Sequence, residues 1–171
     1  MNTLLTPEQD ALYGDPRVIQ KILREAKVFA IVGLSKDEQK ASHFVGAYLQ
    51  RAGYRVIPVN PTAAGTTILG ETVYATLSDI PKEIAVDVVD VFRGDRHCPP
   101  IAREAVVIGA KALWLQLRIV SEEAGEIARA GGLDVVMDRC VKMEHARYAG
   151  RLGWGGMNSG LLSARRARVR V

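Results

Sequence analysis

The sequence predicts an α/β fold, a three-layer sandwich around a mainly parallel sheet of five or six strands. Two observations predict it. Short apolar runs rich in valine and isoleucine alternate along the chain with segments whose apolar residues recur at the three-and-four spacing of an amphipathic helix. At 171 residues the chain also has the size of one domain. Strands that alternate with helices are joined by right-handed crossovers, which make the sheet parallel.

The first part of the chain predicts a helical lead-in and two strands with a helix between them. Residues 6–27 have helical spacing, and residues 28–32 are a continuous apolar run typical of a buried strand. A helix is expected from residue 42 to Gly53, where a glycine suits the helix end. The segment "YRVIPVNP", residues 54–61, predicts the second strand.

The second part repeats the alternation. Strands are expected at residues 86–92, 111–117 and 133–137, and helices at 99–109 and 121–132. Between them and the second strand, residues 62–85 predict a loop with a short edge strand near 72–74 and a helical turn near 77–80. We expect one α/β domain over residues 1–150 and a glycine-rich, basic tail over residues 151–171.

The positive charge is concentrated near the end of the chain. The formal net charge is +4, and the four arginines at 165, 166, 168 and 170 account for all of it. The rest is neutral, so we do not expect nucleic acid as a partner. The basic tail is expected to be a solvated extension or an arm that contacts a polyanion or another subunit.

Two further features bear on the class of protein. No apolar run approaches the roughly 20 residues that cross a bilayer, and the N-terminus lacks the features of a signal peptide, which predicts a cytoplasmic protein without a membrane partner. Cys98 and Cys140 form no CxxC pair, as is common in a reducing compartment.

The loop after the first strand is the first candidate site. In "VGLSKDEQKAS" Gly33 can form a tight turn, while Ser35, Lys36, Lys40 and the amides at the helix start offer donors and positive charge to phosphate. The three-glycine dinucleotide fingerprint is missing, because Ser35 and Glu38 occupy the other two glycine positions.

The residues at the end of the second strand limit which nucleotide could bind. Proteins that bind NAD usually place an acidic residue there for the ribose hydroxyls, but this strand ends with Asn60 and Pro61. A phosphate on the ribose would therefore meet no negative charge. NADP and coenzyme A (CoA) both fit this description.

Six blocks of the sequence resemble the small bacterial CoA-binding proteins. They are "IVGLSKD", "GYRVIPVNP", "LGETVYATLSDIP", "VDVVDVFR", "GAKALWLQL" and "VVMDRCVKMEHAR", in that order, and the resemblance runs from about residue 27 to 147. The family is similar to the N-terminal CoA-binding domain of the succinyl-CoA synthetase alpha subunit. The resemblance implies a Rossmann-like domain that holds CoA across the strand ends.

The resemblance also implies roles for individual residues. It places Gly33, Leu34, Ser35 and Lys36 at the phosphates, Val59, Asn60 and Pro61 by the adenosine, Val91, Phe92 and Arg93 in the wall from the next strand, and Leu115 and Gln116 beside the pantetheine. One departure stands out: the family block usually continues Trp-Leu-Gln with a small residue and glycine, whereas Leu117 and Arg118 follow here. A cation at 118 could crowd the mouth of the site or meet a phosphate.

Other groups of side chains give weaker indications of a catalytic, metal or binding site. Cys140 with Glu144 and His145 could form a nucleophile and base, but the segment is more simply structural, and the spacing of His97 and Cys98 to this group does not resemble a zinc site. Four further interpretations concern other side chains. Asp87 and Asp90 make no credible acid–base pair, Trp114 is either core or a stacking platform, Trp154 is either part of a disordered segment or an anchor against a second subunit, and Phe92 with Arg93 could hold an adenine between them.

We therefore expect a stand-alone CoA or acyl-CoA binding protein with no catalytic residues, no metal and no ligase chemistry. The synthetase transfers phosphate through a histidine in a second domain, for which this chain has no room. Two alternatives stay open: an NADP-dependent oxidoreductase on the same fold, with Cys140, Tyr148 or a histidine as proton donor, and an interaction module that uses the basic tail. Possible partners are a second copy of the chain or an enzyme, and the acyl group is not determined.

Overall fold

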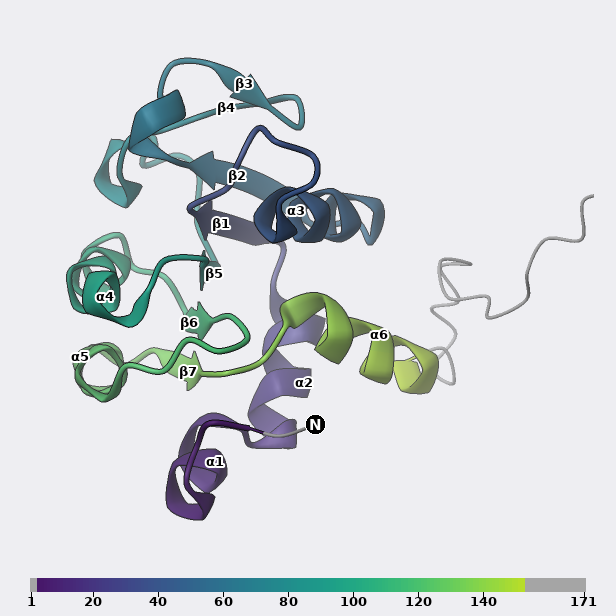
Figure 1. Ribbon diagram of the computed structural model, residues 1–171, viewed down its shortest axis with the longest axis vertical. Helices are drawn as coiled ribbons and strands as arrows, with labels where there is room; N and C mark the ends of the chain where they lie inside the picture. The colour runs from purple at the N-terminus through teal and green to yellow at the C-terminus, as the bar shows by residue number, and fades with distance from the viewer. Residues whose placement is uncertain (1–2, 153–171) are drawn as a thin grey trace, which may run out of the picture.

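A five-stranded parallel sheet forms the centre of the computed structural model, which describes residues 3–152 (Figure 1). In spatial order the strands are β2 (Arg55–Val59), β1 (Val28–Val32), β5 (Val88–Val91), β6 (Ala112–Leu115) and β7 (Asp134–Val136). All four pairings are parallel. The predicted α/β class with a mainly parallel sheet is confirmed.

Helices cover both faces of the sheet. They are α1 (Pro7–Tyr13), α2 (Pro16–Glu25), α3 (Ala41–Arg51), α4 (Cys98–Val107), α5 (Glu122–Ala130) and α6 (Val141–Leu152). In Figure 1 the sheet is seen nearly edge-on, with α4 and α5 on one side, α2, α3 and α6 on the other, and α1 beyond β7. These two layers and the sheet between them make the three-layer sandwich.

The core is divided by the sheet into two apolar clusters. Successive strand residues point to opposite faces, so Ala30, Val89 and Leu113 pack under α4 and α5, while Ile31 and Trp114 pack under the other helices. Both faces are buried, which explains why the strands are continuously apolar. Trp114 is fully buried and its indole N–H donates to the Arg139 carbonyl at 2.7 Å, so it is a core residue.

The lead-in forms two helices because the chain carries two helix starts. Thr6 and Gln9 form a reciprocal capping box at α1, and the Asp15 side chain accepts from the Arg17 amide at the start of α2. Gly14 lies between the two helices. The lead-in is thus an ordered part of the fold, and Tyr13 packs in the core under α5.

The region after β2 adds no sixth strand to the main sheet. Strands β3 (Thr67–Ile68) and β4 (Glu71–Thr72) form a separate antiparallel pair, and the edge strand expected near 72–74 is reduced to a single bridge between Tyr74 and Val59. Turns at Leu69 and Gly70, both with positive φ, reverse the chain after only two residues. Three 3₁₀ turns complete the structure: η1 (Pro61–Ala63), η2 (Leu77–Asp79), where a helical turn was expected, and η3 (Asp95–His97).

The described part of the chain closes with helix α6, Val141–Leu152. The domain boundary expected near residue 150 stays a prediction. Trp154 and the four arginines of the predicted basic tail lie outside the described residues. Within residues 3–152, no helix combines the length and the apolar character that crossing a membrane requires.

Candidate functional site

The candidate site lies where the chain leaves β1 and β5 toward opposite faces of the sheet. Strand β1 leads to α3 on one face, and the neighbouring β5 leads to α4 on the other face (Figure 1). In open α/β sheets the crevice between two such connections is the usual ligand site. The residues predicted from the sequence are at this edge.

Gly33 makes the turn directly after β1. Its φ is +90°, and its amide donates to the Val59 carbonyl at 2.8 Å. A Cβ atom here would lie 3.0 Å from the Cδ of Arg93 and 3.3 Å from the Phe92 carbonyl oxygen. Both the backbone conformation and the close approach of the loop after β5 therefore require glycine.

Asn60 ties the end of β2 to this turn. Its Nδ2 donates to the Leu34 carbonyl at 3.0 Å, and its Oδ1 accepts from the Thr62 amide and hydroxyl at 3.1 and 2.8 Å. Leu34 itself is fully buried, and Gly46 of α3 leaves room for it, since a Cβ there would lie 3.1 Å from the Leu34 Cδ1. Leu34 and Asn60 thus fix the loop, and only the backbone of Leu34 is available to a ligand.

Two residues that sequence reasoning missed hold the loop against α3. The buried Ser42 hydroxyl accepts from the Ser35 amide at 3.0 Å, and His43 Nδ1 donates to the Ser35 carbonyl at 2.8 Å, because a carbonyl oxygen can only accept. The Ser35 hydroxyl accepts from the Asp37 amide at 3.1 Å. A serine and a histidine in the first turn of the predicted helix were the only signal for these contacts.

The start of α3 leaves donors for an anion. The first amides of any α-helix have no intrahelical acceptor. In this 11-residue helix the N-cap residue is Lys40, whose side chain makes no capping hydrogen bond and so does not supply one. Lys36 and Lys40 are both exposed, and within residues 3–152 neither forms an ion pair. The helix dipole and two exposed cations favour phosphate here.

A cavity of about 170 Å³ opens beside the turn, on the α4 face. Its walls include Gly33, Val59, Pro61, Arg93, His97 and Glu104. The Glu104 carboxylate accepts from the Leu77 amide at 3.0 Å and so fixes the wall formed by η2. Typical small-molecule pockets have about 300–1,000 Å³, so this cavity suits one fragment of a ligand, such as a single ring system.

The three residues expected from the next strand are divided between the two faces. Val91 is buried in the core of the α4 face, Phe92 packs against the core on the α3 face, and Arg93 lines the cavity on the α4 face. An adenine therefore cannot lie between Phe92 and Arg93, because neighbouring residues of an extended chain point to opposite sides. A ring in the cavity would meet Arg93 without Phe92.

The side chains at the end of β6 are buried and make contacts within the protein. Leu115 is fully buried, and Gln116 Nε2 donates to Asp90 Oδ1 at 2.8 Å. Asp90 is completely buried, which raises the pKa of its carboxyl to about 7, and its Oδ2 has no partner among the described residues. That Leu115 and Gln116 border a pantetheine stays a prediction.

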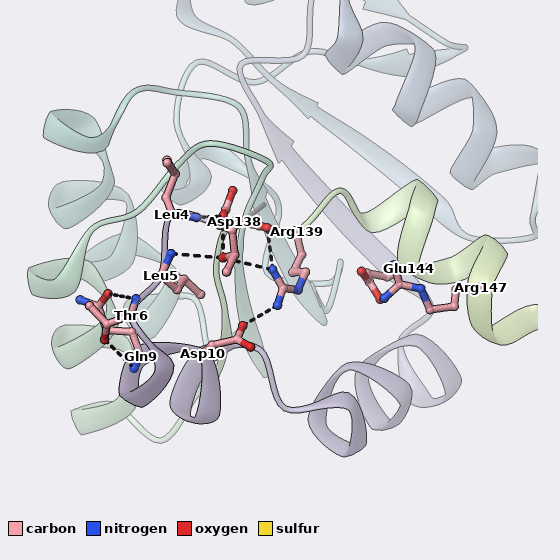
Figure 2. Close-up of polar contacts among 10 residues, drawn as sticks. Leu4, Leu5, Thr6, Gln9, Asp10, Asp138, Arg139, Glu144 and Arg147 are labelled. Atoms are coloured by element: carbon pink, nitrogen blue, oxygen red, sulfur yellow. Dashed lines mark hydrogen bonds and ion pairs between the residues drawn. The ribbon is translucent and has the colours of Figure 1, made fainter. Parts of the chain in front are cut away.

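The other chemistry-bearing groups are structural. His145 Nδ1 contacts the Tyr48 hydroxyl at 2.9 Å, and the buried Glu144 accepts from Arg147 at 3.1 Å (Figure 2). Burial lowers the pKa of His145 and raises that of Glu144. Among residues 3–152 no hydrogen bond joins Cys140 to His145.

Two further groups belong to the framework. Cys98 is buried against the Arg93 and Gly94 carbonyls, and burial raises the pKa of its thiol to about 11. Asp87 lies at the opposite edge of the sheet, where it accepts from the Lys27 and Val28 amides at 2.8 and 3.0 Å. No group of three or more His, Cys, Asp or Glu side chains in the described part of the chain could hold a metal ion.

Comparisons with known proteins match most of this chain to one family. The sequence model of the CoA-binding domain matches residues 27–146. The uncharacterized protein YneT of Bacillus subtilis is 39% identical over 128 residues, which cover 75% of this chain and 92% of that protein. The solved structure of cell-free ID.343 from Thermus thermophilus is 34% identical with a TM-score of 0.73, covering 78% of this chain and 98% of that one.

A larger protein contains a similar domain. The dinucleotide-forming acetyl-coenzyme A synthetase 1 of Ca. Korarchaeum cryptofilum, solved in its apo form, is 25% identical with a TM-score of 0.55. The similarity covers 66% of this chain but only 26% of the synthetase. Because the family model spans most of the chain and a relative of 39% identity is covered almost completely, the chain belongs to the CoA-binding domain family.

Proposed function

We propose that this protein is a cytoplasmic, stand-alone binding protein for coenzyme A or an acyl-CoA, without ligase chemistry of its own. The observation that carries the proposal is the site at the carboxyl ends of β1, β2 and β5. There a glycine turn, an uncapped helix start and a small cavity meet, in a chain of the CoA-binding domain family.

The phosphates of CoA suit the start of α3. The first amides of the helix and the side chains of Lys36 and Lys40 would hold the diphosphate, and Gly33 lets the ligand approach the backbone. The loop needs no rearrangement for this, because Ser42 and His43 already hold Ser35 in place. Binding to a prearranged loop costs less conformational entropy.

The adenosine suits the cavity on the α4 face. Arg93 lines it and offers a planar guanidinium that can stack on a purine. The ribose phosphate would lie near the end of β2, where Asn60 is uncharged and Pro61 follows. A 3′-phosphate there meets no carboxylate of the strand end, so CoA is favoured over NAD.

We expect no acyl or phosphoryl transfer by this domain. Such chemistry needs a nucleophile within hydrogen-bond reach of a base, and within residues 3–152 neither cysteine is bonded to a histidine. The physiological role proposed is therefore binding, with the bound molecule acting as cargo or regulator.

Calorimetric titration with CoA, dephospho-CoA, NADPH and NADH tests the proposal. We expect CoA to bind, dephospho-CoA to bind at least about tenfold more weakly because it lacks the ribose phosphate, and Lys36→Gln with Lys40→Gln to weaken CoA further. Lys82→Gln, an exposed lysine away from the site, is the matched control. Binding of NADPH without CoA binding, together with reduction of a carbonyl substrate, would establish the oxidoreductase alternative instead.

A further inference from the structure

Arg118 adopts a backbone conformation that a side chain normally avoids. It follows β6 by three residues and has φ +68°, in the left-handed region that favours glycine. Glycine is the residue best suited to such a turn, and this chain carries an arginine there. Strained residues of this kind are concentrated at functional sites, which is a reason to ask what the side chain does.

The buried carboxylate of Asp138, at the end of β7, stabilises this backbone conformation. Asp138 is 1% exposed, and its Oδ1 accepts from the Arg118 amide at 2.7 Å. Its Oδ2 accepts from the Thr3 hydroxyl at 2.8 Å and from the Leu4 amide at 2.6 Å (Figure 2). The Asp138 amide in turn donates to the Ile119 carbonyl at 3.3 Å. Asp138 therefore anchors both the N-terminal segment and the loop that carries Arg118.

The loop lies at the ligand edge of the sheet, beyond the phosphate end of the site. Strand β6 is the second neighbour of β1 in the order β1-β5-β6, and adjacent strands are about 4.8 Å apart, so its end lies about 10 Å from the Gly33 turn. With the ribose phosphate proposed at the end of β2 and the diphosphate at the start of α3, the rest of CoA would extend along the strand ends toward β5 and β6, which makes this its thiol end. Since Leu115 and Gln116 are turned inward, the exposed side chains of this segment are Leu117, 38% exposed, and Arg118.

The charge of Arg118 is not neutralised by the rest of the described structure. Of the ion pairs formed within residues 3–152, none includes Arg118. The nearby Asp138 carboxylate is engaged with three donors and is buried. An apolar side chain followed by an unpaired guanidinium is suited to a short carbon chain that ends in an acid.

We propose that Leu117 and Arg118 select acyl-CoA thioesters whose acyl group ends in a carboxylate. This inference rests on the proposed function and adds a substrate class to it. The planar guanidinium binds a carboxylate through two parallel hydrogen bonds, and Leu117 contacts the methylene carbons before it. Asp138 acts as a positioning residue, because it fixes the backbone from which the guanidinium extends.

The test compares acyl-CoAs of equal length with and without the terminal acid. Affinities of the full-length protein are measured by calorimetry for free CoA, for malonyl-, succinyl- and glutaryl-CoA, and for propionyl-, butyryl- and valeryl-CoA. At least one acidic thioester should bind about tenfold more tightly than its neutral counterpart. Arg118→Gln, which removes the charge but keeps a polar side chain, and Arg118→Gly, which suits the backbone, should abolish this ratio and leave the affinity for free CoA unchanged.

The control and the contrary outcomes separate the two proposals. Arg129→Gln changes an exposed arginine in the last turn of α5, at the opposite edge of the sheet, and should keep the ratio. Failure of wild-type protein to bind CoA contradicts the proposed function itself. Normal CoA binding with no acidic preference, or with a preference that survives Arg118→Gln, overturns the inference alone. If Arg118→Gln lowers the affinity for all ligands equally, Arg118 contacts a phosphate instead, and this result also overturns the inference.

Discussion

The buried carboxyl of Asp90 makes the stability of this domain depend on pH around neutrality. Burial raises its pKa from 3.8 to about 7, while the hydrogen bond from Gln116 acts in the opposite direction. The folded protein therefore binds this proton at pH values where the unfolded chain has released it. The resulting stabilisation is fully present below pH 3.8 and is lost as the pH rises through 7.

The size of the effect follows from the separation of the two pKa values. A separation of about three pH units corresponds to about 4 kcal/mol between the protonated and ionised forms. Between pH 5 and pH 8 the free energy of unfolding should fall by about 2–3 kcal/mol from this group alone. A domain of this size would lose about 5–10 °C in Tm.

Asp90→Asn isolates this contribution. The amide has the shape of the protonated acid and can still accept from Gln116 through its oxygen, but it does not titrate. Urea unfolding followed by circular dichroism at pH 5, 6, 7 and 8 gives the free energies. His145 and Glu144, which also have pKa values shifted by burial, titrate in both proteins and cancel in the difference. If wild type and Asp90→Asn lose stability in parallel between pH 5 and 8, the reasoning is refuted.

Three other predictions concern the turn, the anchor and the α3–α6 contact. Gly33→Ala should cost about 1–3 kcal/mol of stability and weaken CoA binding at least tenfold, because φ is +90°; unchanged urea unfolding and calorimetry would contradict this. Asp138→Ala leaves the Leu4 and Arg118 amides without their acceptor, so we expect a loss of about 2–4 kcal/mol and faster hydrogen exchange at residues 3–6; equal exchange would argue against the anchor. Because burial lowers the pKa of His145, stability is lost as the pH falls below 6.5, and His145→Phe should reduce that loss in acid unfolding curves.

Most of the fold could be predicted from the sequence because it depends on local patterns. The apolar runs marked all five strands of the main sheet, and the helical spacing marked the segments between them. The sixth strand was uncertain for a physical reason. Residues 62–85 contain turn-forming glycines and little periodicity, and the chain there forms a separate antiparallel pair with one bridge to β2.

The sequence indicated the strand ends at which the candidate site lies, and the roles of its individual residues stay predictions. The opposite directions of Phe92 and Arg93 follow from the alternation of extended backbone, which sequence reasoning could have applied. The role of Asp138 could not be derived in this way. Its partner Thr3 is 135 residues away, and no local pattern connects the N-terminal segment to the end of β7.

Residues in the left-handed region differ between the two edges of the main sheet. Gly53, Gly109 and Gly132 take positive φ where α3, α4 and α5 return to the strands, and glycine adopts this conformation without strain. At the opposite edge, after β6 and β7, Arg118 and Asp138 take positive φ although both carry side chains. For Asp138 the strain is offset by three hydrogen bonds to its carboxylate. The Arg118 side chain has no such partner among the described residues, and a ligand at this edge would supply one.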